Sequence, residues 1–208
     1  MVPARVSEAP AEPDRIAFEN CIKVGGVVVF PSDTVYGLAC DPLSRVAVER
    51  LYALKGRAGD KPAAVMFFSL DVALAALPEL GTRVRAALAA LLPGGVTLLL
   101  PNPRERFPLA CASDLATLGL RVPDLPALAG VRVPVLQSSA NHAGEPDARC
   151  LAEIPEAIRD GADLVLDGGT LPGTPSTVVD LRTYEEDGRW TVLRSGAVPA
   201  AVVGTVLD

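Results

Sequence analysis

Residues 25–38 read GGVVVFPSDTVYGL and predict a buried strand that runs into a polar loop. The β-branched and aromatic run at 27–30 is typical of a strand that is covered on both faces. Pro31 cannot donate a hydrogen bond to a sheet ladder, so we expect the strand to end there. The residues that follow, 32–38, are expected to form a loop at the carboxyl end of this strand.

Predicted helices and strands alternate on both sides of this segment. Residues 15–24 carry apolar side chains at nearly helical spacing, and Gly25 and Gly26 end that helix. Ser44 can cap a second helix, which ends at Gly56. Helices are further expected at 71–77, 82–92 and 154–159, strands at 63–68, 96–100, 118–122, 133–136, 164–166, 177–181 and 190–193, and a long loop at 101–116. This order favours a mixed α/β sheet over a regular doubly wound one.

The length of 208 residues suits one domain, which we place at residues 15–208. Residues 1–14 are rich in Pro, Ala and Glu and are expected to form a disordered tail. No uncharged apolar run approaches the ~20 residues that span a bilayer, and no apolar signal segment is evident. We therefore expect no membrane contact and a cytoplasmic location.

The formal net charge of −6 argues against a surface that binds nucleic acid over its whole extent. It does not exclude a local basic pocket for a small anion. The four cysteines contain no CxxC pair, and His142 is the single histidine of the chain. Since zinc sites usually bring two ligands close together in sequence, we expect reduced, mostly buried thiols and no metal site built from side chains.

Three cations, Lys55, Arg57 and Lys61, lie within seven positions beside glycines and a proline. Basic loops are usually just solvated. However, each charge-assisted hydrogen bond to phosphate contributes roughly 1.5–3 kcal/mol, so three cations around one loop can hold a triphosphate. Neither a GxxxxGK[ST] phosphate loop nor a GxGxxG dinucleotide motif is present. The cluster therefore indicates nucleotide chemistry outside these two motifs.

Arg121 lies inside the predicted strand 118–122 and faces either solvent or a pocket. In a pocket its guanidinium offers bidentate recognition of a carboxylate, and we assign it a substrate carboxyl group. Asp33 and Asp41 are the nearest carboxylates, and we expect them to stabilise turns.

The segment SSAN at 138–141 ends a predicted strand and begins a loop. Its simplest interpretation is an Asx or Ser turn, because these residue types are common in turns. A hydrolase triad is not expected, because His142 is too close in sequence to Ser139 and no GxSxG elbow occurs.

Seven segments carry a resemblance to a known family, and they cover most of the chain from about residue 16 to residue 198. They are PSDTVYGL (31–38), LYALKGRAGDKP (51–62), LLPGGVTLLL (91–100), TLGLRVP (117–123), SSANHAGEPD (138–147), PSTVVDL (175–181) and LRSG (193–196). Taken in this order they resemble the threonylcarbamoyl-AMP synthases, which are built on the YrdC-like domain. The chain is similar to the short, single-domain form of that family.

The resemblance implies a twisted, mixed but largely parallel-cored α/β sheet with flanking helices and a large concave site. It implies that L-threonine, bicarbonate and ATP, with Mg²⁺ accompanying the ATP, give threonylcarbamoyl-AMP and pyrophosphate. Downstream proteins would transfer the threonylcarbamoyl group to tRNA, giving threonylcarbamoyladenosine. Direct contact with tRNA or other RNA is left open.

The resemblance also implies roles for individual residues. Catalysis at the triphosphate and carbamate is assigned to Lys55, Arg57, Ser139 and Asn141. Threonine binding is assigned to Thr34, Arg121 and Thr177. ATP binding is assigned to Arg57, Lys61, Thr117, Ser138, Ser139 and Arg194.

Three positions depart from the family's pattern. Ser32 stands where threonine is commoner, Met66 where some members offer a histidine to the substrate, and Asp147 where a serine often meets the nucleotide. These differences bear on substrate affinity more than on reaction type. Any gating of the site would come from the chain's own segments, either 101–116 or the N-terminal tail.

Two other functions fit parts of the pattern. A YrdC-like paralogue would keep the fold and bind RNA without making the adenylate, but such relatives lack the KxR signature that this chain has at 55–57. Carbamoyl transfer from carbamoyl phosphate occurs in relatives that fuse this domain to zinc-finger and acylphosphatase segments, and we expect neither segment here.

Overall fold

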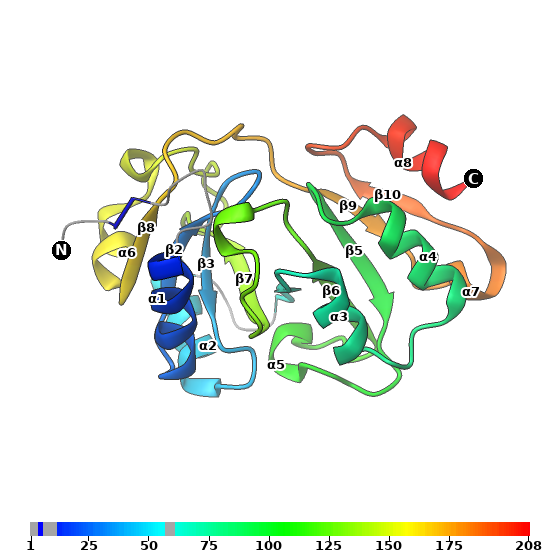
Figure 1. Ribbon diagram of the computed structural model, residues 1–208, viewed down its shortest axis with the longest axis horizontal. Helices are drawn as coiled ribbons and strands as arrows, with labels where there is room; N and C mark the ends of the chain where they lie inside the picture. The colour runs from blue at the N-terminus through cyan, green and yellow to red at the C-terminus, as the bar shows by residue number, and fades with distance from the viewer. Residues whose placement is uncertain (1–3, 6–11, 57–60) are drawn as a thin grey trace.

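The computed structural model describes residues 4–5, 12–56 and 61–208, whose strands form one mixed sheet. The strands are β1 (Ala4–Arg5), β2 (Val28–Pro31), β3 (Tyr36–Cys40), β4 (Ala64–Met66), β5 (Val96–Pro101), β6 (Thr117–Arg121), β7 (Val135–Ser139), β8 (Leu164–Asp167), β9 (Thr177–Asp180) and β10 (Thr191–Arg194). Their order across the sheet is β1-β8-β2-β3-β7-β4-β6-β5-β9-β10. The first and last strands of this order, β1 and β10, lie near opposite ends of the molecule (Figure 1).

The sheet confirms the mixed α/β class, but its core is less parallel than we expected. Among the described residues four neighbouring pairs are parallel, β1–β8, β2–β8, β4–β6 and β5–β9. Five pairs are antiparallel, β2–β3, β3–β7, β4–β7, β5–β6 and β9–β10. Part of the excess of antiparallel pairs comes from short connections between strands. Strands that follow each other closely in the chain, such as β2 and β3, need only a tight turn to pair antiparallel.

The helices are α1 (Glu12–Lys23), α2 (Arg45–Lys55), α3 (Leu70–Ala76), α4 (Thr82–Leu91), α5 (Pro108–Cys111), α6 (Glu156–Gly161), α7 (Tyr184–Asp187) and α8 (Ala200–Leu207). The predicted ends of α2 are confirmed. The Ser44 hydroxyl accepts a hydrogen bond from Ala47 N at 3.3 Å, and Gly56 takes the left-handed conformation with φ of 58°. This geometry leaves Lys55 in the last turn of the helix, where its side chain is buried.

Alternation along the strands sends side chains into two apolar clusters on opposite faces of the sheet. The larger cluster joins Val29, Leu98 and Leu120 to buried residues of α2, α4 and α6. The smaller cluster is formed mainly around α1 and β2, where the ring of Phe18 packs edge-on against Phe30 and Phe68 at centroid distances of 5.5 and 5.2 Å. The smaller cluster covers only part of its face, and the remainder is open for a site.

Several boundaries differ from the sequence predictions. The predicted loop 32–38 is shorter, because β3 begins at Tyr36 and pairs with both β2 and β7. The helix α8 was not predicted, and the predicted loop 101–116 contains α5. In that segment the buried side chain of Asn102 donates to Arg106 O and Leu115 O at 3.0 and 2.9 Å, which ties the two ends together.

The predicted tail, residues 1–14, overlaps two elements of the structure. Ala4–Arg5 pairs with β8, and α1 begins at Glu12 rather than at residue 15. The rest of the predicted tail, residues 1–3 and 6–11, lies outside the described residues. Within the described ranges, none of the helices combines the length and apolar character needed to cross a bilayer.

Candidate functional site

A cavity of about 370 Å³ lies on the sheet face opposite the larger apolar cluster. Strand β6 shows why it is polar. Leu118 and Leu120 point into the core, whereas Thr117, Gly119 and Arg121 alternate with them and line the cavity. Gly119 carries no side chain, so the cavity floor stays open between Thr117 and Arg121.

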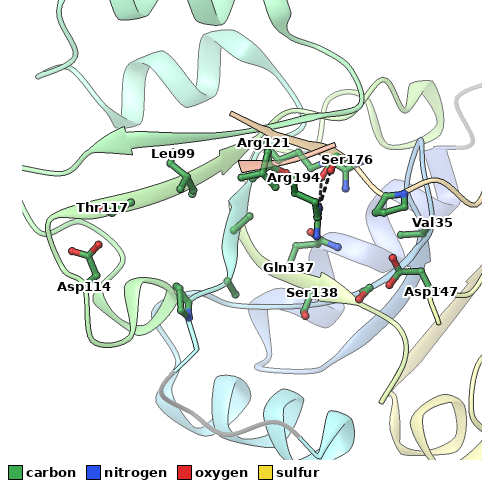
Figure 2. Close-up of a pocket in the computed structure, with 18 of the residues that line it drawn as sticks. Val35, Leu99, Asp114, Thr117, Arg121, Gln137, Ser138, Asp147, Ser176 and Arg194 are labelled. Carbon is green, nitrogen blue, oxygen red and sulfur yellow. Dashed lines mark hydrogen bonds between the residues drawn. The ribbon is translucent and has the colours of Figure 1, made fainter. Parts of the chain in front are cut away.

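Besides Thr97, Asp114 and Arg182, several segments near Arg121 contribute polar side chains to this cavity. They are the carboxyl end of β7, the loop that follows it, the start of β9 and the end of β10. Figure 2 shows these side chains gathered around one hollow, with Arg121, Arg194 and Ser176 close together. Strand β7 contributes Gln137, Ser138 and Ser139, and the loop after it contributes Asp147. Ser176 directly precedes β9, and Arg194 ends β10.

Arg121 is the most deeply buried charge at the cavity, with 3 % of its surface exposed. Its Nη2 donates to Asp33 Oδ1 in an ion pair and to Thr34 Oγ1 at 2.6 Å. Its Nε is the one deeply buried side-chain nitrogen or oxygen without a hydrogen-bond partner among the described residues. A buried donor without an acceptor is costly, so this group is a candidate for binding a ligand oxygen.

The electrostatics of Arg121 point the same way. Burial lowers the pKa of the Arg121 guanidinium, Asp33 opposes this shift by raising it, and the positive charge of Arg194 lowers it further. Burial and a neighbouring like charge both disfavour the charged form. An anion placed between the two guanidiniums would relieve this repulsion, so the cavity is suited to a carboxylate or phosphate.

The turn at 32–35 determines how Thr34 can act. The Ser32 hydroxyl donates to Val35 O at 2.7 Å, so it can only accept in its 3.1 Å contact with Thr34 Oγ1. Thr34 therefore donates its proton to Ser32 and accepts from Arg121. Thr34 is 1 % exposed and lines neither cavity, so its hydroxyl acts on the site through Arg121.

Arg194 is fixed by the segment that precedes β9. Its Nη2 donates to Ser176 O at 2.8 Å and to Ser176 Oγ at 3.2 Å, and Ser176 Oγ lies 2.8 Å from Thr97 Oγ1. The dashed lines in Figure 2 mark the bonds between Arg194 and Ser176. Ser176 thus places a cationic group at the wall of the cavity.

A smaller cavity of about 180 Å³ adjoins the first and shares Ser138 and Ser139 with it. It is lined by Lys55 at the end of α2, by Lys61, and by residues 138–144, which include Asn141. Strand β7 thus places its two terminal serines where they face both cavities. This pair of adjoining cavities provides room for two reactants.

Lys55, Ser139 and Asn141, which the sequence placed in one signature, do meet in space. Lys55 Nζ donates to Ser139 O, to Asn141 O at 2.8 Å and to Asn141 Oδ1 at 3.0 Å. Ser139 Oγ donates to Asn141 Oδ1 at 2.6 Å, and Asn141 Nδ2 donates to Glu145 O. The buried ammonium thus holds the loop after β7 in place.

Of the other predicted site residues, some line a cavity and others do not. Thr117, Ser138 and Arg194 line the larger cavity, and Lys61 is exposed at the smaller one. Thr34 lies behind the wall, in contact with Arg121. Arg57 lies outside the described residues.

Thr177 is not brought to the cavity. It is fully buried, and its hydroxyl donates to Val198 O at 2.6 Å and accepts from Val198 N at 3.0 Å. Its neighbour Ser176 lines the cavity instead. Residues 176, 178 and 180 share one face of the strand, and the apolar partners Val179 and Leu181 already indicate that Thr177 belongs to the opposite face.

Two departures from the family's pattern have different outcomes. Met66 is fully buried in the smaller apolar cluster and does not line either cavity. Asp147 lines the larger cavity and is half-buried. Asp33, which we expected only to stabilise a turn, is the ion-pair partner of Arg121.

The described residues contain no group of three or more His, Cys, Asp or Glu side chains placed to hold a metal ion. The carboxylates at the larger cavity, Asp114 and Asp147, come from separate loops. Mg²⁺ is commonly held by one or two carboxylates together with substrate phosphates, so these residues are compatible with an ion that arrives with a nucleotide.

Gly196 is expected to tolerate no side chain. A Cβ at this position would lie 2.2 Å from Pro175 O and 2.5 Å from the carbonyl carbon of Ser176, both of which are backbone atoms. We expect Gly196→Ala to destabilise the protein by about 1–3 kcal/mol, because the segment that holds Arg194 must move. Chemical denaturation measures this change. Gly204→Ala is the control, since its Cβ would meet ordinary or nearly ordinary contacts in α8, and equal stability of the two variants would contradict the expectation.

A family model matches residues 20–196 of this chain; it is the Sua5/YciO/YrdC model, described as telomere recombination. Curated relatives named threonylcarbamoyl-AMP synthase include one from Pseudomonas aeruginosa, 36% identical over 170 residues that cover 78% of this chain and 89% of the relative. Another, from Xanthomonas campestris, is 35% identical over 182 residues, covering 84% of this chain and 96% of the relative.

Solved structures extend the similarity to the fold. Pyrococcus abyssi Sua5 complexed with L-threonine matches with a TM-score of 0.85 and 27% identity. The match covers 99% of this chain and 61% of the Sua5 chain, so this chain spans about three fifths of that protein. The twisted α/β sheet with flanking helices is thereby confirmed.

Proposed function

Because this chain belongs to the Sua5/YciO/YrdC family, we propose that it is an L-threonylcarbamoyl-AMP synthase. The enzyme condenses L-threonine, bicarbonate and ATP to threonylcarbamoyl-AMP, pyrophosphate and water. The threonine amine takes up carbon dioxide derived from bicarbonate and loses a proton to give a carbamate. A carbamate oxygen then forms a bond to the α-phosphorus of ATP, and the bond to the leaving pyrophosphate breaks.

One observation carries this proposal: a buried guanidinium with an unsatisfied Nε lies at a cavity that a second guanidinium also lines. The two cations, Arg121 and Arg194, suit a reaction in which one substrate is a carboxylate and the other a polyphosphate. Asp33 compensates the charge of Arg121 in part, and an anionic ligand would add to this compensation whereas a neutral ligand would not. The L-threonine complex of the Sua5 relative supports L-threonine as one of the substrates.

The residues divide between the two substrates. Arg121 receives the threonine carboxylate, and Thr34, whose own proton is donated to Ser32, accepts from Arg121 behind the cavity wall and so helps to hold the guanidinium in place. Arg194 lines the same cavity close to Arg121, where it can meet phosphate oxygens. The serines shared by both cavities, Ser138 and Ser139, stand between the reacting groups.

Catalysis in this scheme is mainly positioning and charge stabilisation. Negative charge grows on the α-phosphate and the leaving pyrophosphate, and cations aimed at these oxygens lower the barrier. Lys61 lies at the smaller cavity, and Lys55 keeps the loop 139–141 in the shape that lines it. Mg²⁺ accompanies ATP and neutralises phosphate charge when bound. The scheme requires no side chain to act as a general base.

The product is proposed to be consumed in the cytoplasm by proteins that transfer the threonylcarbamoyl group to an adenosine of tRNA. An acyl adenylate is an activated, hydrolysable compound, so a group-transfer step must follow its synthesis. The charge of −6 gives no support to tight binding of RNA by this chain itself.

Pyrophosphate release from ATP tests the proposal. We expect release that requires both L-threonine and bicarbonate, and a product whose mass equals that of threonylcarbamoyl-AMP. Glycine, which lacks the hydroxyl and methyl groups, should support much slower release. Absence of release under all conditions, together with salt-sensitive binding of tRNA, would refute the synthase function and favour an RNA-binding paralogue.

A further inference from the structure

We propose that Asp33 is a positioning residue for substrate recognition, which acts by holding the guanidinium of Arg121 at the cavity wall. The inference rests on the proposed function, in which Arg121 receives the substrate carboxylate. Asp33 does not line either cavity, so its effect on the substrate passes through Arg121.

The contacts of Asp33 join three separate segments. One carboxylate oxygen, Oδ1, accepts from Arg121 Nη2 at the end of β6. The other, Oδ2, accepts from the backbone N–H of Asp124 at 3.1 Å, in the segment that follows β6. Asp33 itself lies in the turn between β2 and β3. Because both oxygens are used, the carboxylate can neither rotate nor shift without losing a hydrogen bond.

These contacts determine which part of Arg121 a substrate can reach. A guanidinium has five N–H groups, of which two belong to Nη2. Asp33 and Thr34 accept from Nη2, so both of its N–H groups are directed to protein oxygens. In the part of the chain that the structure describes, Nε and Nη1 are left without a protein acceptor, and because Nε is itself buried, Nη1 is the nitrogen that a ligand in the cavity reaches first. Without Asp33, Nη2 would be able to turn toward the cavity, and the orientation of the fork would no longer be defined.

The charge of Asp33 matters as much as its geometry. Arg121 has 3 % of its side chain exposed and Asp33 has 10 %, so the pair is largely shielded from water. Burial and Arg194 both act against the positive charge of Arg121, and Asp33 is the group that opposes them. Neutralising Asp33 therefore leaves a buried cation with a hydroxyl as its remaining acceptor, which favours movement of the guanidinium away from its place.

The experiment compares Asp33→Asn with the unmodified enzyme in threonine-dependent pyrophosphate release. We expect the KM for threonine to rise about tenfold or more, because removing one partner of a buried, hydrogen-bonded charge pair weakens recognition strongly. The KM for ATP should change by less than about twofold, which a general loss of structure would not produce. Asp33→Glu keeps the charge but shifts the guanidinium by one methylene, and it should also raise the KM for threonine selectively.

Coupling to Arg121 provides the decisive readout. In an Arg121→Ala background, Asp33→Asn should cause no further rise in the KM for threonine, since there is no guanidinium left to position. Asp187→Asn is the matched control: Asp187 also pairs with an arginine and accepts a backbone N–H, but on the exposed surface. It should leave both KM values unchanged.

Two results would overturn the inference. An unchanged KM for threonine in folded Asp33→Asn and Asp33→Glu would show that Arg121 needs no positioning. A lowered KM would show that Asp33 competes with the substrate carboxylate for Arg121. Both results presuppose an active unmodified enzyme, so they are distinguishable from failure of the proposed function, in which the unmodified enzyme itself releases no pyrophosphate.

Discussion

Lys55→Ala is expected to lower the rate of pyrophosphate release by about a hundredfold or more at saturating substrates. The buried ammonium donates to three oxygens of Ser139 and Asn141. A hydrogen bond from a charged donor contributes roughly 1.5–3 kcal/mol, and each 1.36 kcal/mol corresponds to about tenfold in rate. Loss of the ammonium removes the one donor that these three oxygens share, and within the described chain Asn141 Oδ1 keeps only its bond from Ser139 Oγ, so the loop between the two cavities must rearrange.

Lys55→Met separates the chemical effect from unfolding. Methionine retains most of the volume of the side chain and avoids a large void beside α2. We expect Lys55→Met to remain folded, as measured by thermal unfolding, and still to lose most of its turnover. Lys23→Ala is the control, because Lys23 is an exposed lysine whose partner is Glu19 on the same helix. Near-normal turnover of folded Lys55→Met would remove Lys55 from the catalytic machinery.

Arg121→Ala is expected to raise the KM for threonine by about a hundredfold or more, with a much smaller effect on the KM for ATP. Two losses combine: the fork that receives the substrate carboxylate disappears, and Asp33 is left as a largely buried, unpaired carboxylate. Initial rates measured over a range of threonine concentrations at saturating ATP give this split. Stability should also fall, because the remaining buried charge has no counter-ion.

Arg121→Lys refines this prediction. Lysine keeps the positive charge but lacks the planar guanidinium, so it cannot offer a substrate carboxylate two parallel N–H groups while it also binds Asp33 and Thr34. We expect the KM for threonine to rise by about tenfold or more while the protein regains stability relative to Arg121→Ala. Arg189→Ala, which removes an exposed arginine paired with Asp187, should change neither KM. An unchanged threonine dependence in a folded Arg121→Ala would contradict the carboxylate assignment.

Much of the fold could be predicted from the sequence, because the ends of helices and the alternation of strand residues depend on residues that are close together in the chain. The Ser44 cap and the Gly56 end of α2 were predicted from residue types alone, and both are present. Strand β6 was predicted from Leu118, Leu120 and Val122, which form its core-facing side. The same alternation places Arg121 on the opposite face, and the structure shows that a cavity lies there.

The same local patterns were insufficient at three places. Strand β3 was taken for loop because Ser32, Asp33 and Thr34 precede it and Gly37 interrupts it; pairing with β2 and with the distant β7 outweighs this composition. The C-terminal helix α8 has no N-cap side chain to mark its start. Thr177 was assigned to the site in place of Ser176, because the resemblance was applied without the alternation of strand faces.

Residue types and their spacing were thus enough to predict the mixed α/β class, the ends of α2 and the presence of cationic groups for anionic substrates. The site itself required the tertiary structure. Arg121 meets Asp33 across 88 residues, and Lys55 meets Ser139 across 84. Such contacts are created by the strand order, which brings the turn between β2 and β3 close to the end of β6, and the end of α2 close to the end of β7. Local sequence contains no information on these distant neighbours, so only the folded sheet decides that Asp33 pairs with Arg121 and that Lys55 holds the loop after β7.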